Sequence, residues 1–109
     1  EFFFRVARYY KVGRVPIPLW SYRVHPNNMH SNVAHMEKDA LFTYKCAKDN
    51  NLFHSKKFER YCFAKMYKIV GASWWGDGNN KSRGMLFFLK SFFYNPGVIL
   101  KSIANKLKR

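Results

Sequence analysis

The sequence predicts a mainly α-helical protein, in which a helical hairpin is followed by C-terminal helices and preceded by an extended, proline-containing N-terminal arm. Three observations support this prediction. Apolar residues recur at helical spacing in the middle of the chain, the pair Asn95–Pro96 is typical of a helix start, and three prolines interrupt the first third. We therefore expect one domain with three parts: an N-terminal helix and arm (1–36), the hairpin (37–71), and a Trp/Gly loop with basic C-terminal helices (72–109).

The first part combines a short helix with an extended segment. Residues 2–11 place apolar side chains on one helical face and three cations on the other, and we expect Gly13 to cap this helix. The segment 12–35 contains the three prolines, which exclude a regular helix and favour extended backbone. A segment of this length is unusual inside a compact domain, so we expect it to lie along a partner as an arm.

The middle of the chain predicts two helices joined by a short polar turn. We expect the first over 37–48, with Glu37 in its first turn, where negative charge is favourable. Ser55 is a typical N-cap for the second helix, which we expect to run to about Val70 and to stop at Gly71. The apolar stripe of this second helix is expected to consist of Phe58, Tyr61, Cys62, Met66 and Ile69.

The last third predicts a loop and two further helices. We expect the loop over 72–83, centred on two tryptophans, and helices over 84–94 and 96–108. The apolar stripe of the last helix is expected to consist of Ile99, Leu100, Ile103 and Leu107.

The charge balance is the strongest indication of function. Twenty Lys and Arg face six Asp and Glu, which leaves a net charge of +14, and no acidic residue follows Asp77. A solvated surface needs only about 2 to 8 net charges for solubility. A larger excess favours polyanions, because binding to phosphates releases counterions, although anionic lipid headgroups attract the same clusters.

The aromatic content is also high, at 19% of residues, within 48% hydrophobic residues overall. This composition excludes a disordered chain and requires a core, a partner surface or a lipid boundary. The stretch 84–100 carries one charge, Lys90, but Asn95 and Pro96 interrupt it, and it falls short of the roughly 20 residues that span a bilayer. We expect an interfacial or partner-buried helix there, not a spanning one.

The spacing of potential metal ligands and nucleophiles does not fit a catalytic or metal site. His25, His30 and His35 are each five residues apart, whereas ligand pairs on a helix need three or four. Cys46 and Cys62 form no close pair, and we expect both to be buried free thiols, although the basic neighbours of Cys62 could lower its pKa. The remaining carboxylates are scattered, and the stretch 76–83 lacks the spacing of a phosphate-binding glycine loop. We expect no catalytic residue, no metal and no cofactor, and therefore not an enzyme.

Basic residues interleaved with aromatic ones supply the candidate RNA-binding site. The candidates for phosphate contact are Arg5, Arg8, Lys11, Arg14, Lys81 and Arg83. Trp74 and Trp75 could stack on exposed bases, or alternatively could anchor their loop on the core.

The stretch RVARYYKVGRVPIPLWSYRVHPN, residues 5–27, resembles the opening of a mitochondrion-specific small-subunit ribosomal protein, the twenty-third in the small-subunit naming series. The positions that carry the resemblance are Gly13, Pro18, Leu19, Trp20, Tyr22, Val24 and Pro26. The second proline of that pattern is missing, because Asn27 follows Pro26. The resemblance covers about a fifth of the chain and implies a structural role in a mitochondrial ribosome, with no catalytic residues.

Together these features predict a structural RNA-binding subunit of a ribosome in the mitochondrial matrix, bound to ribosomal RNA and neighbouring ribosomal proteins. The alternative is an accessory subunit of a respiratory-chain or ATP synthase complex at the matrix face of the inner membrane. In that case its partners would be membrane-complex subunits and anionic lipid, and Phe87, Phe88, Phe92 and Phe93 would face them. Because the chain begins at Glu1 and not at Met, we expect a processed or trimmed chain; its first residues lack the pattern of a secretory signal.

Overall fold

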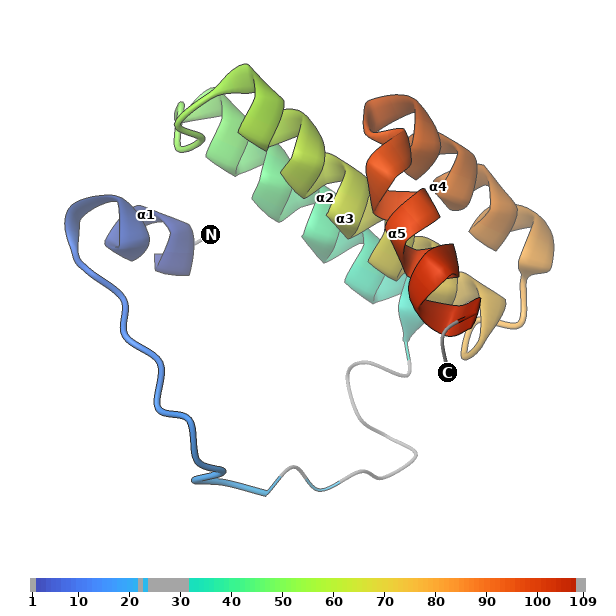
Figure 1. The fold of residues 1–109 in the computed structure, drawn as a ribbon, viewed down its shortest axis with the longest axis horizontal. Coiled ribbons are helices and arrows are strands. Elements are labelled where there is room, and N and C mark those ends of the chain that lie inside the picture. The colour runs from blue at the N-terminus through green and yellow to red at the C-terminus, as the bar shows by residue number, and fades with distance from the viewer. Residues whose placement is uncertain (1, 22, 24–31, 108–109) are drawn as a thin grey trace.

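The protein is seen in a computed structural model that describes residues 2–21, 23 and 32–107, and helix is the regular structure of this part of the chain. The helices follow in the order α1 (Phe2–Tyr9), α2 (Val33–Asp49), α3 (Lys56–Trp75), α4 (Lys81–Tyr94) and α5 (Pro96–Leu107). The predicted fold class is confirmed. Helices α2 and α3 form an antiparallel hairpin, α4 and α5 follow it, and residues 10–21 leave α1 as a segment without regular structure (Figure 1).

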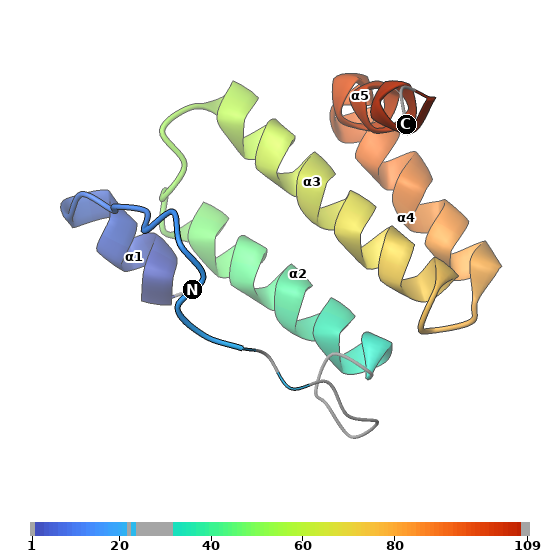
Figure 2. The same ribbon diagram turned by 60° about the horizontal axis from the view of Figure 1, so that its bottom comes forward.

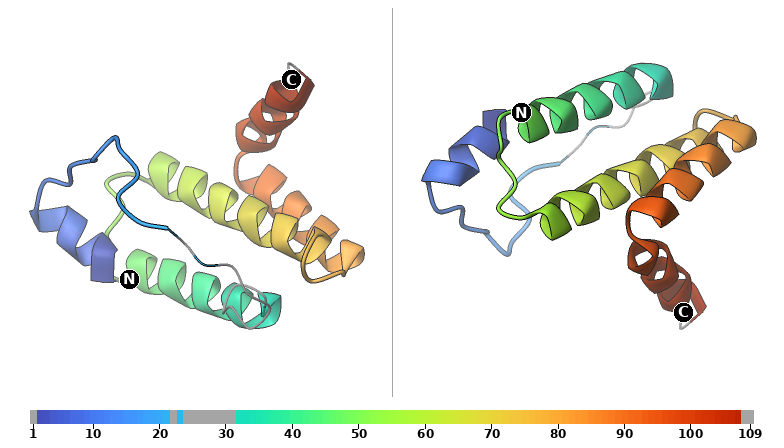
Figure 3. Two further views of the ribbon diagram at one scale, coloured as in Figure 1. Left: turned by 90° about the horizontal axis from the view of Figure 1, so that it is seen from below. Right: turned by 90° about the horizontal axis from the view of Figure 1, so that it is seen from above.

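Helix α3 is the central element. It lies between α2 on one side and α4 on the other (Figure 2), while α5 turns away from α4 after Asn95 and also contacts α3 (Figure 3). The core cluster consists of Phe63, Met66 and Val70 of α3 together with Phe87 of α4, and Tyr44 of α2 packs against it. The small hairpin is therefore stabilised mainly through burial of α3.

The buried face of α3 differs from the predicted stripe. Met66 is buried, Cys62 is half-buried, and Phe58, Tyr61 and Ile69 are exposed. The prediction was right for Met66 and wrong for the exposed positions, because α3 has neighbours on two sides, which also bury Phe63, Ala64, Val70 and Gly71. A single stripe describes a helix that packs against one surface only.

Two close-packed glycines explain why α3 does not stop at Gly71. A Cβ atom at Gly71 would lie 3.0 Å from the carbonyl oxygen of Gly84, and one at Gly84 would lie 2.9 Å from that of Gly71. Glycine at these positions therefore permits the close approach of α3 and α4, and α3 continues to Trp75. The predicted loop over 72–83 shortens to residues 76–80.

The helix starts follow from polar caps. The side chain of Asn32 accepts from the backbone N–H of His35, so α2 begins at Val33 and Glu37 lies beyond its first turn, contrary to the prediction. Ser55 caps α3 as predicted. Asn80 caps α4 by accepting from the backbone N–H of Arg83, which moves the start of α4 from the predicted residue 84 to Lys81.

The N-terminal helix lies beside the end of the hairpin at which α2 passes into α3. Helix α1 buries none of its residues, but its Phe4 ring meets the Tyr44 ring edge-on at a centroid distance of 5.7 Å. It ends at Tyr9, before the predicted cap at Gly13, and residues 11–21 of the arm are exposed. Predictions for residues 22 and 24–31 lie outside the described residues. Within the described residues, no helix combines the length and the apolarity that crossing a membrane requires.

Candidate nucleic-acid interface

The structure separates the eight predicted RNA-binding residues into two groups. Arg5 and Arg8 lie on α1, where Arg8 reaches the C-terminal end of α2, and Lys11 and Arg14 lie on the arm that follows α1. The other four surround the turn between α3 and α4, close to the N-terminal half of α2, and are Trp74, Trp75, Lys81 and Arg83. Helix α2 has 17 residues and is about 25 Å long at 1.5 Å per residue. The two groups therefore lie toward opposite ends of the hairpin (Figure 1).

The second group is organised by one buried carboxylate. Glu37 is 8% exposed. Its Oε1 accepts a hydrogen bond from Arg83 Nη2 at 2.9 Å, and its Oε2 accepts from Arg83 Nε at 3.0 Å and from Trp74 Nε1 at 2.6 Å. The Arg83 guanidinium also lies 4.7 Å from the centroid of the Trp74 ring. These contacts join α2, α3 and α4, and they give Arg83 a structural partner in addition to any phosphate.

The charge state of Glu37 follows from these contacts. Burial alone raises the pKa of this carboxyl, but the hydrogen bonds from Arg83 and Trp74 and the nearby positive charges outweigh burial and hold its pKa below the ordinary value. The hydrogen bond to Glu37 is in turn the main cause that raises the pKa of Arg83. The pair is therefore charged at neutral pH.

The two tryptophans have different environments. Trp74 is anchored, because its indole N–H is bonded to Glu37 and its ring leaves no room for a Cβ atom at Gly78, which would lie 2.4 Å from Trp74 Cε3. Trp75 is 44% exposed, and Lys81 Nζ lies 5.9 Å from the centroid of its ring. The loop-anchoring alternative therefore describes Trp74, whereas Trp75 has a partly exposed ring with the Lys81 ammonium beside it.

The first group is more exposed. The Arg8 guanidinium donates to the carbonyl oxygens of Asn50 and Asn51, at 3.2 and 3.4 Å, where α2 ends. This contact suits the partial negative charge of a helix C-terminus. Arg5 on α1, and Lys11 and Arg14 on the arm, are exposed.

Sequence reasoning missed further pairs of a cation and a ring. Lys65 Nζ lies 4.9 Å from the centroid of the Tyr61 ring, and Lys90 Nζ lies 5.0 Å from that of Phe87. The hydrogen bond with Tyr61 raises the pKa of Lys65. A spacing of three or four residues on one helix is a signal for such pairs, and both sets show it. Arg60 is engaged differently, since it donates to the carbonyl oxygens of Phe93 and Tyr94 at the end of α4.

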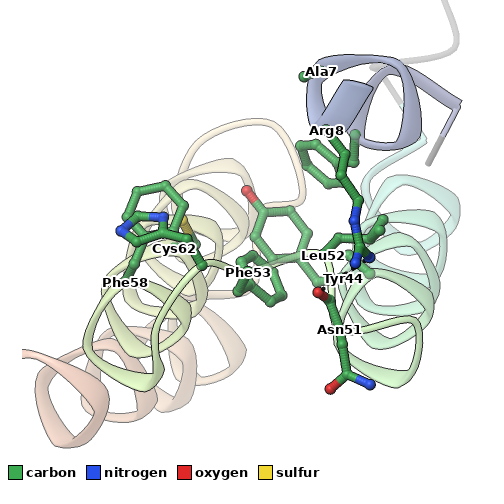
Figure 4. Close-up of a pocket in the computed structure, with 11 residues that line it drawn as sticks. Ala7, Arg8, Tyr44, Asn51, Leu52, Phe53, Phe58 and Cys62 are labelled. Carbon is green, nitrogen blue, oxygen red and sulfur yellow. Dashed lines mark hydrogen bonds between the residues drawn. The ribbon is translucent and has the colours of Figure 1, made fainter. Parts of the chain in front are cut away.

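A cleft of about 560 Å³ lies between α1 and the hairpin (Figure 4). Its walls include the rings of Phe4, Tyr44, Phe53 and Phe58, while Arg8 lies on the α1 side. Its described lining holds no carboxylate. The thiol of Cys62 lines the cleft, and burial raises its pKa, contrary to the depressed value considered from sequence.

The ligand types for metal binding are dispersed in the fold. Within residues 2–21, 23 and 32–107, no three His, Cys, Asp or Glu side chains gather in a metal-binding arrangement. Cys46 and Cys62 are free thiols, and both are half-buried.

Comparison with known proteins identified no matching family model, no matching curated protein and no matching solved structure.

Proposed function

We propose that this chain is a structural, non-catalytic RNA-binding subunit of a mitochondrial ribosome, bound to ribosomal RNA and to neighbouring ribosomal proteins. The observation that carries the proposal is an excess of exposed cations set beside aromatic rings. Six carboxylates cannot neutralise twenty Lys and Arg, and two of the six, Glu37 and Glu59, already pair within the fold. The mitochondrial location rests on the resemblance of residues 5–27.

The two groups of candidate residues support different parts of this function. Cations on α1 and the arm would contact phosphates, which fixes the position of a protein without reading the base sequence. At the turn between α3 and α4, Trp75 offers a ring for an unpaired base and Lys81 a charge for the adjoining phosphate. Their separation along α2 would allow the chain to bridge two RNA segments.

RNA binding by the full chain tests the proposal. We expect affinity for a single-stranded ribosomal RNA fragment to fall linearly with the logarithm of salt concentration. Lys81→Gln should reduce this slope by about 1, and Trp75→Ala should cost about 1–3 kcal/mol of binding. Lys56→Gln is the matched control, since Lys56 already pairs with Glu59 at 3.0 Å. Salt-independent binding would contradict the proposal, and an unchanged affinity in both variants would contradict the site at this turn.

A second candidate, an accessory subunit of a respiratory-chain or ATP synthase complex, is favoured by one observation. The outward side of α4 is apolar and exposed, with Phe93 76% exposed, whereas Phe87, expected from sequence to face the membrane, is in the core. Ribonuclease treatment of detergent-solubilised particles separates the two. Release of the protein by the nuclease supports the ribosome, and retention in a nuclease-resistant complex supports the membrane assembly.

A further inference from the structure

The outward half of α4 is covered by large apolar side chains. Gly84, Phe87 and Ser91 are buried against the hairpin. At about 3.6 residues per turn, the opposite side of the helix carries five residues that are 45% to 76% exposed, namely Met85, Leu86, Leu89, Phe92 and Phe93. We call these five residues the α4 stripe. A helix that is apolar on all sides is normally buried, so the α4 stripe is suited to a further surface.

The borders of the stripe are basic. Lys81 lies one turn before Met85 and Lys90 lies one turn after Leu86, on opposite sides of the stripe, while Ser82 is the only polar residue of α4 between these two sides. The Lys90 side chain extends over the Phe87 ring, with Nζ 5.0 Å from its centroid. Such a lysine places its apolar stem along the helix and its charge at the edge. The charged residues of α4 and of the chain that follows it are all basic, while Glu37 of α2, which pairs with Arg83, is buried.

We propose that the α4 stripe binds the surface of a lipid bilayer that contains anionic lipids, with α4 lying parallel to the membrane plane. The apolar side chains would enter the boundary between headgroups and acyl chains, and Lys81 and Lys90 would meet headgroup phosphates. This is the pattern of an interfacial helix: one apolar face, basic edges, and binding that depends on both. Helix α4 has 14 residues and is about 21 Å long, which suits such an orientation.

Charge argues for lipid over the other occupants. A symmetric pair of stripes would bring the lysines of both chains to the same contact, and each chain carries a net charge of +14. A protein partner would need an apolar groove bordered by carboxylates on both sides, whereas an anionic bilayer supplies apolar depth and negative borders along the whole helix. The inference does not depend on the proposed RNA function, since the stripe residues are separate from the RNA candidates; Lys81 alone borders both.

Vesicle co-sedimentation with the full chain tests the inference. We expect binding to mixed phosphatidylcholine–phosphatidylglycerol vesicles to exceed binding to phosphatidylcholine vesicles at the same lipid concentration. The double variant Leu89→Ser with Phe93→Ser should bind the mixed vesicles at least about tenfold more weakly, because it removes two large apolar side chains from the contact. Ile69→Ser is the matched control, because Ile69 is 58% exposed on α3 and lies outside the stripe.

Several results would overturn the inference. The first is that the wild type and the double variant bind the mixed vesicles equally well, and the second is that the wild type binds both vesicle compositions equally well. The third is that the wild type does not bind vesicles but self-associates, and that the double variant abolishes this self-association. Circular dichroism of each variant shows whether it remains helical, and Lys90→Gln, which leaves the apolar residues in place, should weaken binding to the mixed vesicles only. The RNA affinity of the double variant should be unchanged, so a failure of the lipid-binding inference can be distinguished from a failure of the RNA-binding proposal.

Discussion

Glu37 and Arg83 lie 46 residues apart in the sequence, and the carboxylate of Glu37 accepts two hydrogen bonds from the guanidinium of Arg83, at 2.9 and 3.0 Å. This pair connects α2 to the beginning of α4, and Trp74 of α3 bonds to the same carboxylate. One of the few acidic residues of a strongly basic chain thus holds three helices together. The pair also determines which of the candidate RNA-binding residues have a second, structural role.

Loss of the Glu37 charge should destabilise the fold. Glu37→Gln removes one acceptor oxygen and leaves Arg83 and Trp74 with weaker partners, so we expect the free energy of unfolding to fall by about 1–3 kcal/mol. Urea unfolding followed by circular dichroism measures this change. Asp39→Asn is the control, because Asp39 is exposed and its ion pair in the described part is with His35 on the same helix, and it should change stability by no more than about 0.5 kcal/mol. Equal effects of the two substitutions would show that the buried pair contributes nothing.

Acid should weaken the same contact. Because the folded pKa of Glu37 lies below its ordinary value of 4.5, the folded state binds this proton less readily than the unfolded state does. The stabilisation is therefore complete above pH 4.5 and is lost as the pH falls through the lowered folded pKa. We expect the wild type to lose more stability than Glu37→Gln in this acidic range, as measured by urea unfolding at a series of pH values. Parallel pH curves for the two proteins would contradict this prediction.

The contact between Gly71 and Gly84 should not tolerate a methyl group. In Gly84→Ala the new Cβ atom would lie 2.9 Å from the Gly71 carbonyl oxygen. The oxygen belongs to the backbone and the Cβ atom is fixed directly to it, so α3 and α4 must move apart, at a cost of about 1–3 kcal/mol. The better helix propensity of alanine offsets up to about 1 kcal/mol of this cost. At Gly76 a Cβ atom would make an ordinary contact of 3.5 Å, so Gly76→Ala is the control. If Gly84→Ala had the same melting temperature as the wild type, the close packing of these two glycines would be refuted.

The parts of the fold that local chemistry determines were predictable from the sequence. Ser55 caps α3 because its hydroxyl accepts from the Phe58 N–H, and Pro96 begins α5 after Asn95, as expected. Signals of this kind depend on neighbouring residues only. They do not reveal which helix faces are buried, since Gly71, a typical helix end, becomes a packing position once Gly84 lies opposite it.

The candidate site likewise has features that the sequence predicts and features that depend on tertiary packing. Its charge and its aromatic residues are visible in the composition, but the sequence gives no sign that Glu37 lies beside Arg83, because this contact depends on how three helices pack. The expectation that Glu37 serves the helix start was therefore wrong, and Arg83 was counted as available for phosphate without its carboxylate partner. The distinction between Trp74 and Trp75 likewise arises only from tertiary structure.

The adjacent tryptophans should respond differently to substitution. Trp74→Phe removes the N–H that donates to Glu37 at 2.6 Å, so we expect a loss of about 1–3 kcal/mol in the free energy of unfolding. Trp75→Phe keeps an exposed ring beside Lys81 and should leave stability within about 0.5 kcal/mol of the wild type. Urea unfolding of the two variants measures the difference. Because the two substitutions are chemically identical and one residue apart, equal stability losses would contradict the anchoring of Trp74, and a larger loss in Trp75→Phe would reverse the assignment of the two rings.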